Sequence, residues 1–196
     1  MTIQTSYHQT IENLIKTIEP YDAIEKSHQK DALNWIKTGA PLCRIAKPDT
    51  PPKHLVSYFI LLDTKKRQLL LVDHKKALLW LPPGGHVEPE EHPTAAAFRE
   101  LEEELNIKLS LLKEDPLFIT VTKTVGKTAG HTDVTLWYVF SADSSVSYTY
   151  DQSEFETIKW YSLDDLPMTR TDPNLSRFCN KLRQFTSTTF CNKEQL

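Results

Sequence analysis

Residues 84–107, GGHVEPEEHPTAAAFRELEEELNI, join a glycine pair to a dense run of carboxylates. Seven glutamates lie between Glu88 and Glu104, and Arg99 is the only arginine or lysine among them. Pro93 suits the first position of a helix, the alanines after it are strong helix formers, and Asn106 stands where a helix would end. The stretch therefore predicts a loop followed by a helix over residues 93–105.

Three carboxylates share one face of that helix, because Glu103 and Glu104 follow Glu100 by three and four residues. Leu101 and Leu105 recur on a neighbouring face, which can pack inward. Repulsion between such carboxylates costs only about a few tenths of a kcal/mol per pair on an exposed helix. A solvated acidic face is therefore one interpretation, and a bound cation that cancels the repulsion is the other.

The glycines upstream favour the cation. Gly84 and Gly85 let a backbone carbonyl or amide approach a ligand closely. A hard cation such as Mg²⁺ prefers oxygen ligands, keeps several waters and is usually shared with substrate phosphates. Arg99 lies about 100° around the helix from Glu100. We therefore expect Arg99 to point away from that face, toward a loop carboxylate such as Glu91.

This segment resembles the Nudix box, G-x5-E-x7-R-E-U-x-E-E-x-G-U, in which U is an aliphatic residue. Eight of the nine fixed positions match over residues 85–107, and Asn106 stands in place of the last glycine. Asparagine tolerates a left-handed backbone better than most residues, so the helix can still end there. The resemblance covers about residues 54–167. The matching residues are Gly85, Glu91, Arg99, Glu100, Leu101, Glu103, Glu104 and Ile107.

Nudix proteins hydrolyse nucleoside diphosphates linked to another moiety (NDP-X) and use Mg²⁺ or Mn²⁺. By this resemblance, Glu103 and Glu104 are the main metal ligands and catalytic carboxylates, and Glu100 is a further ligand or the base that activates water. A carbonyl of Gly84 or Gly85 completes the metal shell. The residues expected to hold the loop to the helix are Arg99 and Glu91.

The family also takes its base from a later loop, and three carboxylates of residues 150–157 qualify, although each also suits an ordinary polar loop. Substrate contacts are equally open. His131 and Asp133 flank a strand and can reach a phosphate or a metal-bound water, or simply form a turn. Trp80 can stack on a base or pack in the core. The candidate bases are Asp151, Glu154 and Glu156, and Glu154 is also a candidate for substrate binding.

Strand patterns surround the acidic segment. Residues 54–63 and 68–75 are rich in β-formers and are joined by TKKR, which predicts a hairpin. Residues 78–88 predict a loop, and residues 173–189 predict a helix with an apolar stripe. The order predicts an α/β or α+β domain, and the resemblance implies an α/β/α sandwich with a mixed sheet. Further strands are expected at residues 109–112, 117–125, 134–142 and 157–163.

The first 40 residues predict two helices, separated at Pro20, with Asp22 capping the second and Gly39 closing it. Four prolines over residues 41–53 indicate a linker. We therefore expect a helical extension at 1–40, a linker at 41–53 and a hydrolase domain at 54–190. The extension can cover the core, form a homodimer or gate the substrate.

Composition limits the partners. The chain has 196 residues, 39% hydrophobic content and a net charge of −3, so neither nucleic acid nor a membrane is expected as a partner. No signal peptide or membrane span is predicted, and Cys43, Cys179 and Cys191 form no CxxC pair. These features indicate reduced thiols in a cytoplasmic protein that acts on a small nucleotide-like substrate. A non-hydrolytic nucleotide sensor remains the alternative to a hydrolase.

Overall fold

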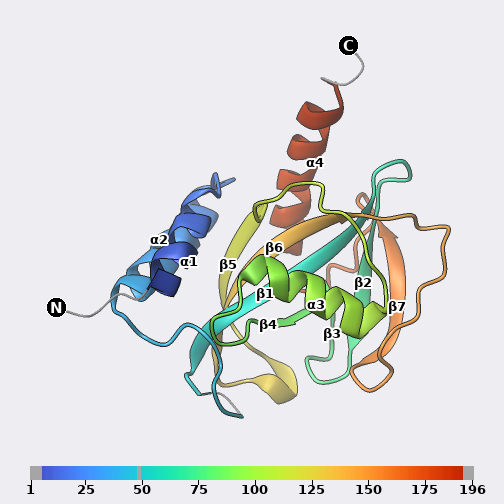
Figure 1. Ribbon diagram of the computed structural model, residues 1–196. Coiled ribbons are helices and arrows are strands. Elements are labelled where there is room, and N and C mark those ends of the chain that lie inside the picture. Colours follow the sequence, from blue (N-terminus) through green and yellow to red (C-terminus); the bar gives the residue numbers. More distant parts are fainter. Residues whose placement is uncertain (1–5, 48–49, 192–196) are drawn as a thin grey trace.

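The computed structural model describes residues 6–47 and 50–191 (Figure 1). One mixed sheet of seven strands forms its centre, with the order β3-β2-β1-β6-β5. In addition, β4 pairs with β1, and β7 pairs with β2. The strands are β1 (Lys53–Asp63), β2 (Gln68–His74), β3 (Leu79–Leu81), β4 (Gly84–His86), β5 (Phe118–Lys123), β6 (Thr132–Ser141) and β7 (Phe155–Ser162).

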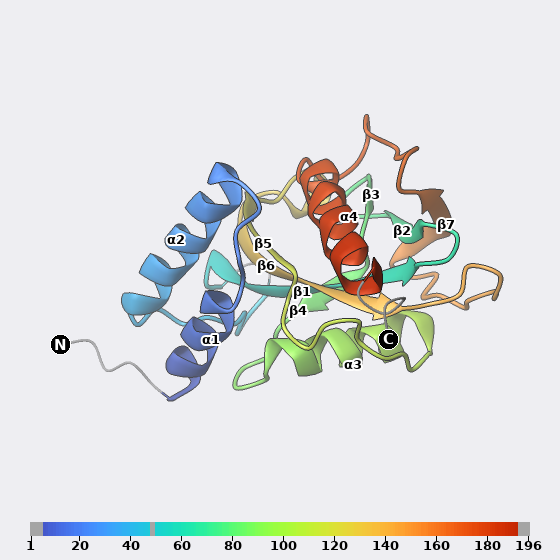
Figure 2. The same cartoon turned by 90° about the horizontal axis from the view of Figure 1, so that it is seen from above.

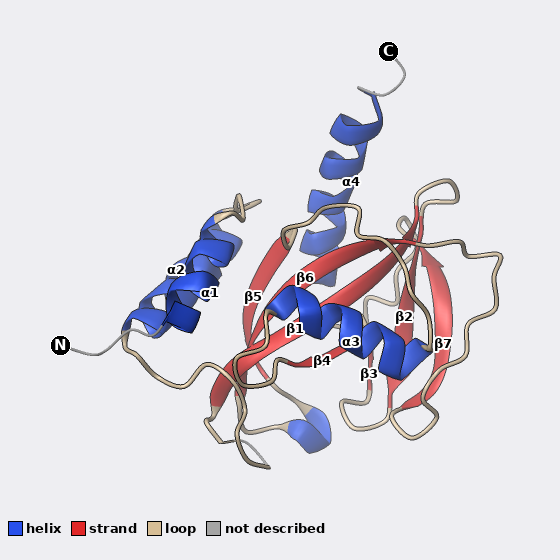
Figure 3. Cartoon of the chain, viewed as in Figure 1, coloured by secondary structure: helices blue, strands red, loops and turns tan. Residues whose placement is uncertain are grey.

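Helices cover both faces of this sheet, as Figures 2 and 3 show. Helix α3 lies on one face and α4 on the other, while α1 and α2 pack together beside β5. The predicted mixed α+β fold is confirmed. The helices are α1 (Ser6–Lys16), α2 (Ala23–Lys37), α3 (Pro93–Leu105) and α4 (Leu175–Cys191), and a 3-10 turn, η1, spans Gly126–Thr128.

The central strand β1 is buried along almost its whole length, because both of its faces are covered. Successive side chains of a strand point to opposite faces. Accordingly, Phe59 and Leu61 belong to the core under α3, whereas Ile60 and Leu62 belong to the core under α4. Strand β6 runs parallel to β1 over ten paired positions, and this pairing fixes which polar residues meet at the start of the two strands.

The predicted hairpin joins β1 to β2, and Asp63 holds its turn. The Asp63 carboxylate accepts hydrogen bonds from the backbone amides of Lys65 and Lys66, at 3.0 and 2.9 Å. It also accepts from the amide and hydroxyl of Ser144, at 2.9 and 2.8 Å. One buried carboxylate thus ties the turn to the loop that follows β6.

Helix α3 has the predicted bounds. The His92 ring accepts a hydrogen bond from the Thr94 amide, and Pro93 occupies the first turn. At the other end, Asn106 adopts the left-handed conformation, with φ 53° and ψ 43°. Its amide donates to the Glu102 carbonyl at 2.9 Å. Asparagine therefore performs at this helix end the backbone task that glycine usually performs.

Two local expectations are wrong. The loop expected over residues 78–88 contains the short strands β3 and β4, whose pairing with β2 and β1 a three-residue pattern cannot reveal. Conversely, the strand expected at residues 109–112 forms only an isolated bridge between Leu111 and Phe140. Its backbone makes hydrogen bonds with the end of β6, from the Leu112 amide to the Val139 carbonyl and from the Ser141 amide to the Ser110 carbonyl.

The N-terminal helices are held by buried polar contacts. Asp22 caps α2 by accepting from the amides of Ile24 and Glu25. The Glu25 side chain is fully buried and pairs with Lys181 of α4 at 2.8 Å. It also accepts from the Ile119 amide of β5 at 3.2 Å. Helix α2 is therefore joined to both β5 and α4.

Cys43 and Cys179 are buried free thiols, and the side chain of Cys191 lies outside the described part of the chain. Cys43 and the neighbouring Leu42 belong to the core under α3. Strand β1 begins at Lys53, within the stretch expected as a linker. Among the described residues, no helix is long and apolar enough to cross a membrane.

Candidate active site

The glycine pair of β4 brings strand and helix into direct contact. Gly84 has φ 150°, and a Cβ there would lie 2.2 Å from the Ser57 carbonyl oxygen of β1. A Cβ on Gly85 would lie 2.2 Å from Oε1 of Glu100. Glycine is therefore required twice, once for pairing with β1 and once for the approach of a carboxylate.

Two of the three expected glutamates face a cavity of about 940 Å³. The side chains of Glu100 and Glu104 line it and are largely buried. The Glu103 side chain is 59% exposed and is not part of the cavity wall. Helical geometry explains the difference, because Glu104 lies about 40° around the helix from Glu100, whereas Glu103 lies about 60° in the other direction.

Arg99 joins the loop before α3 to the helix itself. Its Nε and Nη2 atoms donate to the two oxygens of Glu91, each at 2.9 Å. Nη2 also donates to the His86 carbonyl at 3.0 Å, and Nη1 donates to Glu100 at 2.7 Å and to Glu103 at 3.3 Å. The expectation that Arg99 points away from Glu100 is wrong, because its long side chain folds back across the helix.

Arg99 also sets the charge state of this loop. Burial raises the pKa of Glu91, but the hydrogen bonds from Arg99 outweigh it and lower the pKa overall. The pKa of Arg99 is raised, first by its hydrogen bond to Glu91. The pair is therefore fully ionised near neutral pH.

Glu100 and Glu104 carry the opposite perturbation. Burial raises the pKa of Glu100, and the hydrogen bond from Arg99 only partly offsets it. Burial raises the pKa of Glu104 well above its ordinary value, and the charges of Glu100 and Glu154 raise it further. Among the described residues, Oε2 of Glu104 is buried without a hydrogen-bond partner. Negative charge here needs a partner, and a cation supplies one.

Of the three carboxylates expected in the later loop, the structure brings one to the cavity. Glu154 lines the wall, and its Oε1 lies 3.5 Å from Nζ of Lys76. Asp151 and Glu156 do not line it. The Asp151 amide instead donates to the Glu104 carbonyl at 2.8 Å, which fixes this loop against the end of α3.

Of the other residues expected to contact the substrate, two line the cavity and one does not. His131 and Asp133 line the cavity, whereas Trp80 does not. The Trp80 ring lies against Tyr161, with 5.3 Å between centroids, and beneath the guanidinium of Arg170. The Trp80 side chain therefore packs on the face of the sheet that α4 covers.

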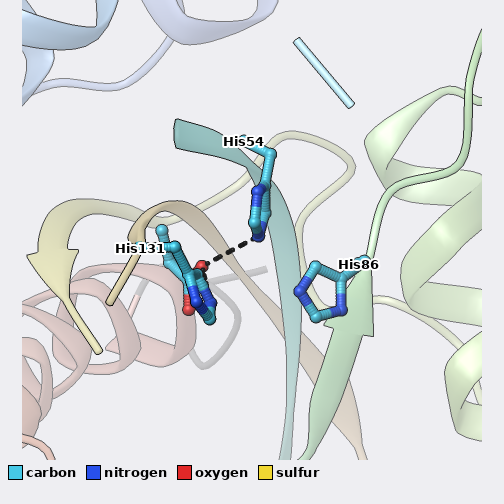
Figure 4. Close-up of side chains that lie close together, drawn as sticks. His54, His86 and His131 are labelled. Carbon is cyan, nitrogen blue, oxygen red and sulfur yellow. Dashed lines mark ion pairs between the residues drawn. The ribbon is translucent and has the colours of Figure 1, made fainter. Parts of the chain in front are cut away.

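Sequence reasoning missed two histidines that join His131 and Asp133. The rings of His54, His86 and His131 gather in one place, each from a different segment (Figure 4). His54 lies opposite Asp133 in the parallel pairing of β1 and β6. In the sequence, the HTD spacing of residues 131–133 indicates His131 and Asp133. The other two residues of the group join them only through the register of the strands.

Comparison with known families agrees with this geometry. The model of the NUDIX domain matches residues 52–182. The chain therefore belongs to the NUDIX family, and it is a Nudix-type pyrophosphate hydrolase. No curated protein sequence matches the chain.

Solved structures show the same fold. A NUDIX-family hydrolase from Clostridium perfringens is 24% identical, with a TM-score of 0.53, over 67% of this chain and 97% of that one. A MutT NUDIX hydrolase from Burkholderia pseudomallei is 24% identical, with a TM-score of 0.50, over 66% and 97%. An Ap4A hydrolase from C. elegans, solved as a binary complex, is 21% identical, with a TM-score of 0.57, over 68% and 98%.

Proposed function

We propose that the protein is a metal-dependent hydrolase that cleaves a diphosphate linkage in a nucleotide or another NDP-X substrate by attack of water at phosphorus. The observation that carries this proposal is the buried pair Glu100 and Glu104, which share one wall of a large cavity. Phosphoryl transfer needs positioning and charge stabilisation more than covalent chemistry. A cavity with carboxylates beside cationic side chains suits that task.

The residues present fit a divalent cation such as Mg²⁺ or Mn²⁺. Oε2 of Glu104 is a buried oxygen without a hydrogen-bond partner among the described residues, and hard cations prefer oxygen ligands. Glu100 and Glu104 would hold the ion, with a carbonyl of Gly84 or Gly85. When bound, such an ion neutralises phosphate charge and lowers the pKa of a coordinated water. Glu103 can bind the same ion only if it breaks its ion pair with Arg99.

The protein's own residues then divide the remaining work. Glu154 faces the same cavity as the glutamates of α3 and is the best-placed group to accept a proton from the attacking water. Arg44, Lys47 and Lys127 also line the cavity, and their charges suit the phosphates of the substrate. Arg99 holds the loop and helix in register, so that the carboxylates keep their spacing.

The test is a screen of nucleotides and NDP-X compounds with Mg²⁺ and Mn²⁺. We expect turnover to fall by about 100-fold or more in Glu104→Gln, because a charged group that positions the reacting atoms is lost. Glu102→Gln is the matched control, because Glu102 lies on the same helix but pairs with Lys108 at the surface. Wild-type turnover no higher than that of Glu104→Gln would refute the proposal, and tight nucleotide binding without turnover would favour a sensor.

A further inference from the structure

We propose that His54, His86, His131 and Asp133 form a second metal site, selective for a transition-metal ion of the Zn²⁺ type. This group, called the histidine site below, shares no residue with the glutamates of α3, although His86, His131 and Asp133 line the same cavity as Glu100 and Glu104. Gly85 touches Glu100, and the next residue of β4, His86, points to the opposite side of the strand. Metal binding at this site does not require the proposed hydrolysis.

Strand register brings the four residues to one face of the sheet. His54 pairs with Asp133 across β1 and β6, and His86 pairs with Val56, two residues after His54. His131 precedes Asp133 by two residues, so the two side chains can point the same way. Three of the four residues therefore lie on neighbouring strands, and His131 lies in the bend directly before β6.

The distances suit a small ion. One potential ligand atom from each residue lies within 4.8 Å of all the others. Oδ1 of Asp133 lies 3.4 Å from Nε2 of His54 and 3.2 Å from Nε2 of His131. Zinc bonds of about 2.0–2.1 Å in a tetrahedron place ligand atoms about 3.3 Å apart. Two edges of such a tetrahedron are thus already close to their final length.

The hydrogen-bond pattern of three of these side chains leaves lone pairs free on the side that faces the centre of the group. His54 is fully buried, and its Nδ1 lies 2.9 Å from the Pro51 carbonyl, which can only accept. Nδ1 therefore carries the proton and Nε2 presents a lone pair, the arrangement typical of metal-binding histidines. Nε2 of His54, Oδ1 of Asp133 and Nε2 of His86 are buried without hydrogen-bond partners in the described part of the chain.

Buried polar atoms without a hydrogen-bond partner are costly, and one ion bound to all of them would remove that cost. The His54 ring stacks on that of His131, with 4.8 Å between centroids, so the two rings present their edges to the same space. The His86 ring lies beside them, with 4.8 Å between its centroid and that of His54. Neutral imidazole is the form that binds metals.

The donor set predicts both selectivity and role. Three imidazole nitrogens and one carboxylate favour Zn²⁺, Co²⁺ or Ni²⁺, whereas the all-oxygen set on α3 favours Mg²⁺ or Mn²⁺. Four protein ligands complete a tetrahedral shell and leave no position for a reacting water, as in structural zinc sites. The ion would therefore lock β1, β4 and β6 together, and its effect should appear in stability.

Metal binding by the protein after chelator treatment tests the site without any measurement of turnover. We expect one Co²⁺ per chain, with the intense visible absorption of tetrahedral cobalt, and a higher Tm with Zn²⁺ than with Mg²⁺. His86→Gln and Asp133→Asn should each weaken Co²⁺ binding by about 100-fold. Glu104→Gln, in the other carboxylate set, should keep both the stoichiometry and the spectrum.

Three outcomes would overturn the proposal. The first is a wild-type protein that takes up neither Co²⁺ nor Zn²⁺. The second is unchanged uptake in both His86→Gln and Asp133→Asn, which would indicate adventitious binding. The third is uptake that Glu104→Gln abolishes and the two variants of the histidine site retain. Circular dichroism of each variant identifies any loss that arises from misfolding, and the two substitutions on different strands provide independent tests.

Discussion

Replacing Gly85 by alanine tests whether the glycine pair exists to admit the Glu100 carboxylate. A Cβ at this position would lie 2.2 Å from Oε1, 2.3 Å from Cδ and 2.6 Å from Oε2 of Glu100. Unlike Gly84, with φ 150°, Gly85 is not among the residues with positive φ. Alanine therefore suits the backbone of Gly85, and the clash with the side chain is the perturbation.

The structure sets the magnitude. To restore an ordinary contact of 3.4 Å, the carboxylate must retreat by about 1.2 Å, which breaks its 2.7 Å hydrogen bond with Arg99. Overpacking of this kind costs about 1–3 kcal/mol in the free energy of unfolding. A displacement of about 1 Å at a positioning group can lower turnover by about 100-fold. We expect Gly85→Ala to show both losses.

Thermal melting and metal-dependent hydrolysis of a reactive nucleotide are the two assays. In the double variant Gly85→Ala/Glu100→Ala the obstructing carboxylate is gone, so the stability lost in Gly85→Ala should return while turnover stays low. A Gly85→Ala protein with wild-type Tm and wild-type turnover would refute the steric argument. So would additive destabilisation in the double variant, because additivity means that the two residues do not interact.

Two further predictions concern single residues. Burial raises the pKa of Asp63, but hydrogen bonds from Lys66 and Ser144 outweigh it and lower that pKa to about 2 from an ordinary 3.8. The stabilisation is thus complete above about pH 4 and lost as pH falls toward 2. Asp63→Asn should therefore lower the free energy of unfolding at pH 7 by about 1–2 kcal/mol, after allowance for solvent screening. Measured by urea unfolding, this free energy should also fall less steeply between about pH 4 and pH 2 in the variant than in the wild type. At Asn106, with φ 53°, Gly should match the wild type within about 0.5 kcal/mol and Ala should cost about 1–2 kcal/mol, measured by thermal melting; equal Tm values for Ala and Gly would contradict the left-handed geometry.

The sequence predicts best where the information is local. The bounds of α3 follow from Pro93 at one end and Asn106 at the other, because capping and helix periodicity depend on neighbouring residues. The same reasoning found the cap of α2 at Asp22. It found the pairing of Arg99 with Glu91 but missed the contact with Glu100, because about 100° per residue locates the Cα–Cβ bond and not the tip of a long side chain.

The histidine site shows why the remainder of the cavity was not predictable. His54, His86 and His131 are separated by dozens of residues, and only the pairing of β1 with β4 and β6 brings them together. Each histidine taken alone suits an ordinary strand end. A shift of one residue in register would turn a strand's side chains to the other face. The site therefore depends on strand register, which a sequence motif does not specify.

The N-terminal helices lie outside the Nudix box, yet contacts run from them to its carboxylates. The Tyr7 hydroxyl of α1 donates to the Glu91 carbonyl at 2.8 Å, the Glu91 side chain binds Arg99, and Arg99 binds Glu100. We infer from these contacts that α1 supports the loop that orients the box.

Helix α2 is fixed more firmly still. Its Glu25 is fully buried against Lys181 of α4, and a buried charge that loses its partner costs about 3–5 kcal/mol. Removing α2 would leave Lys181, itself largely buried, without that carboxylate, and would uncover β5 beside it. Although the family model begins at residue 52, we infer that the two helices and the sheet form one cooperative unit, in which the position of the carboxylates of α3 depends on residues far outside the motif.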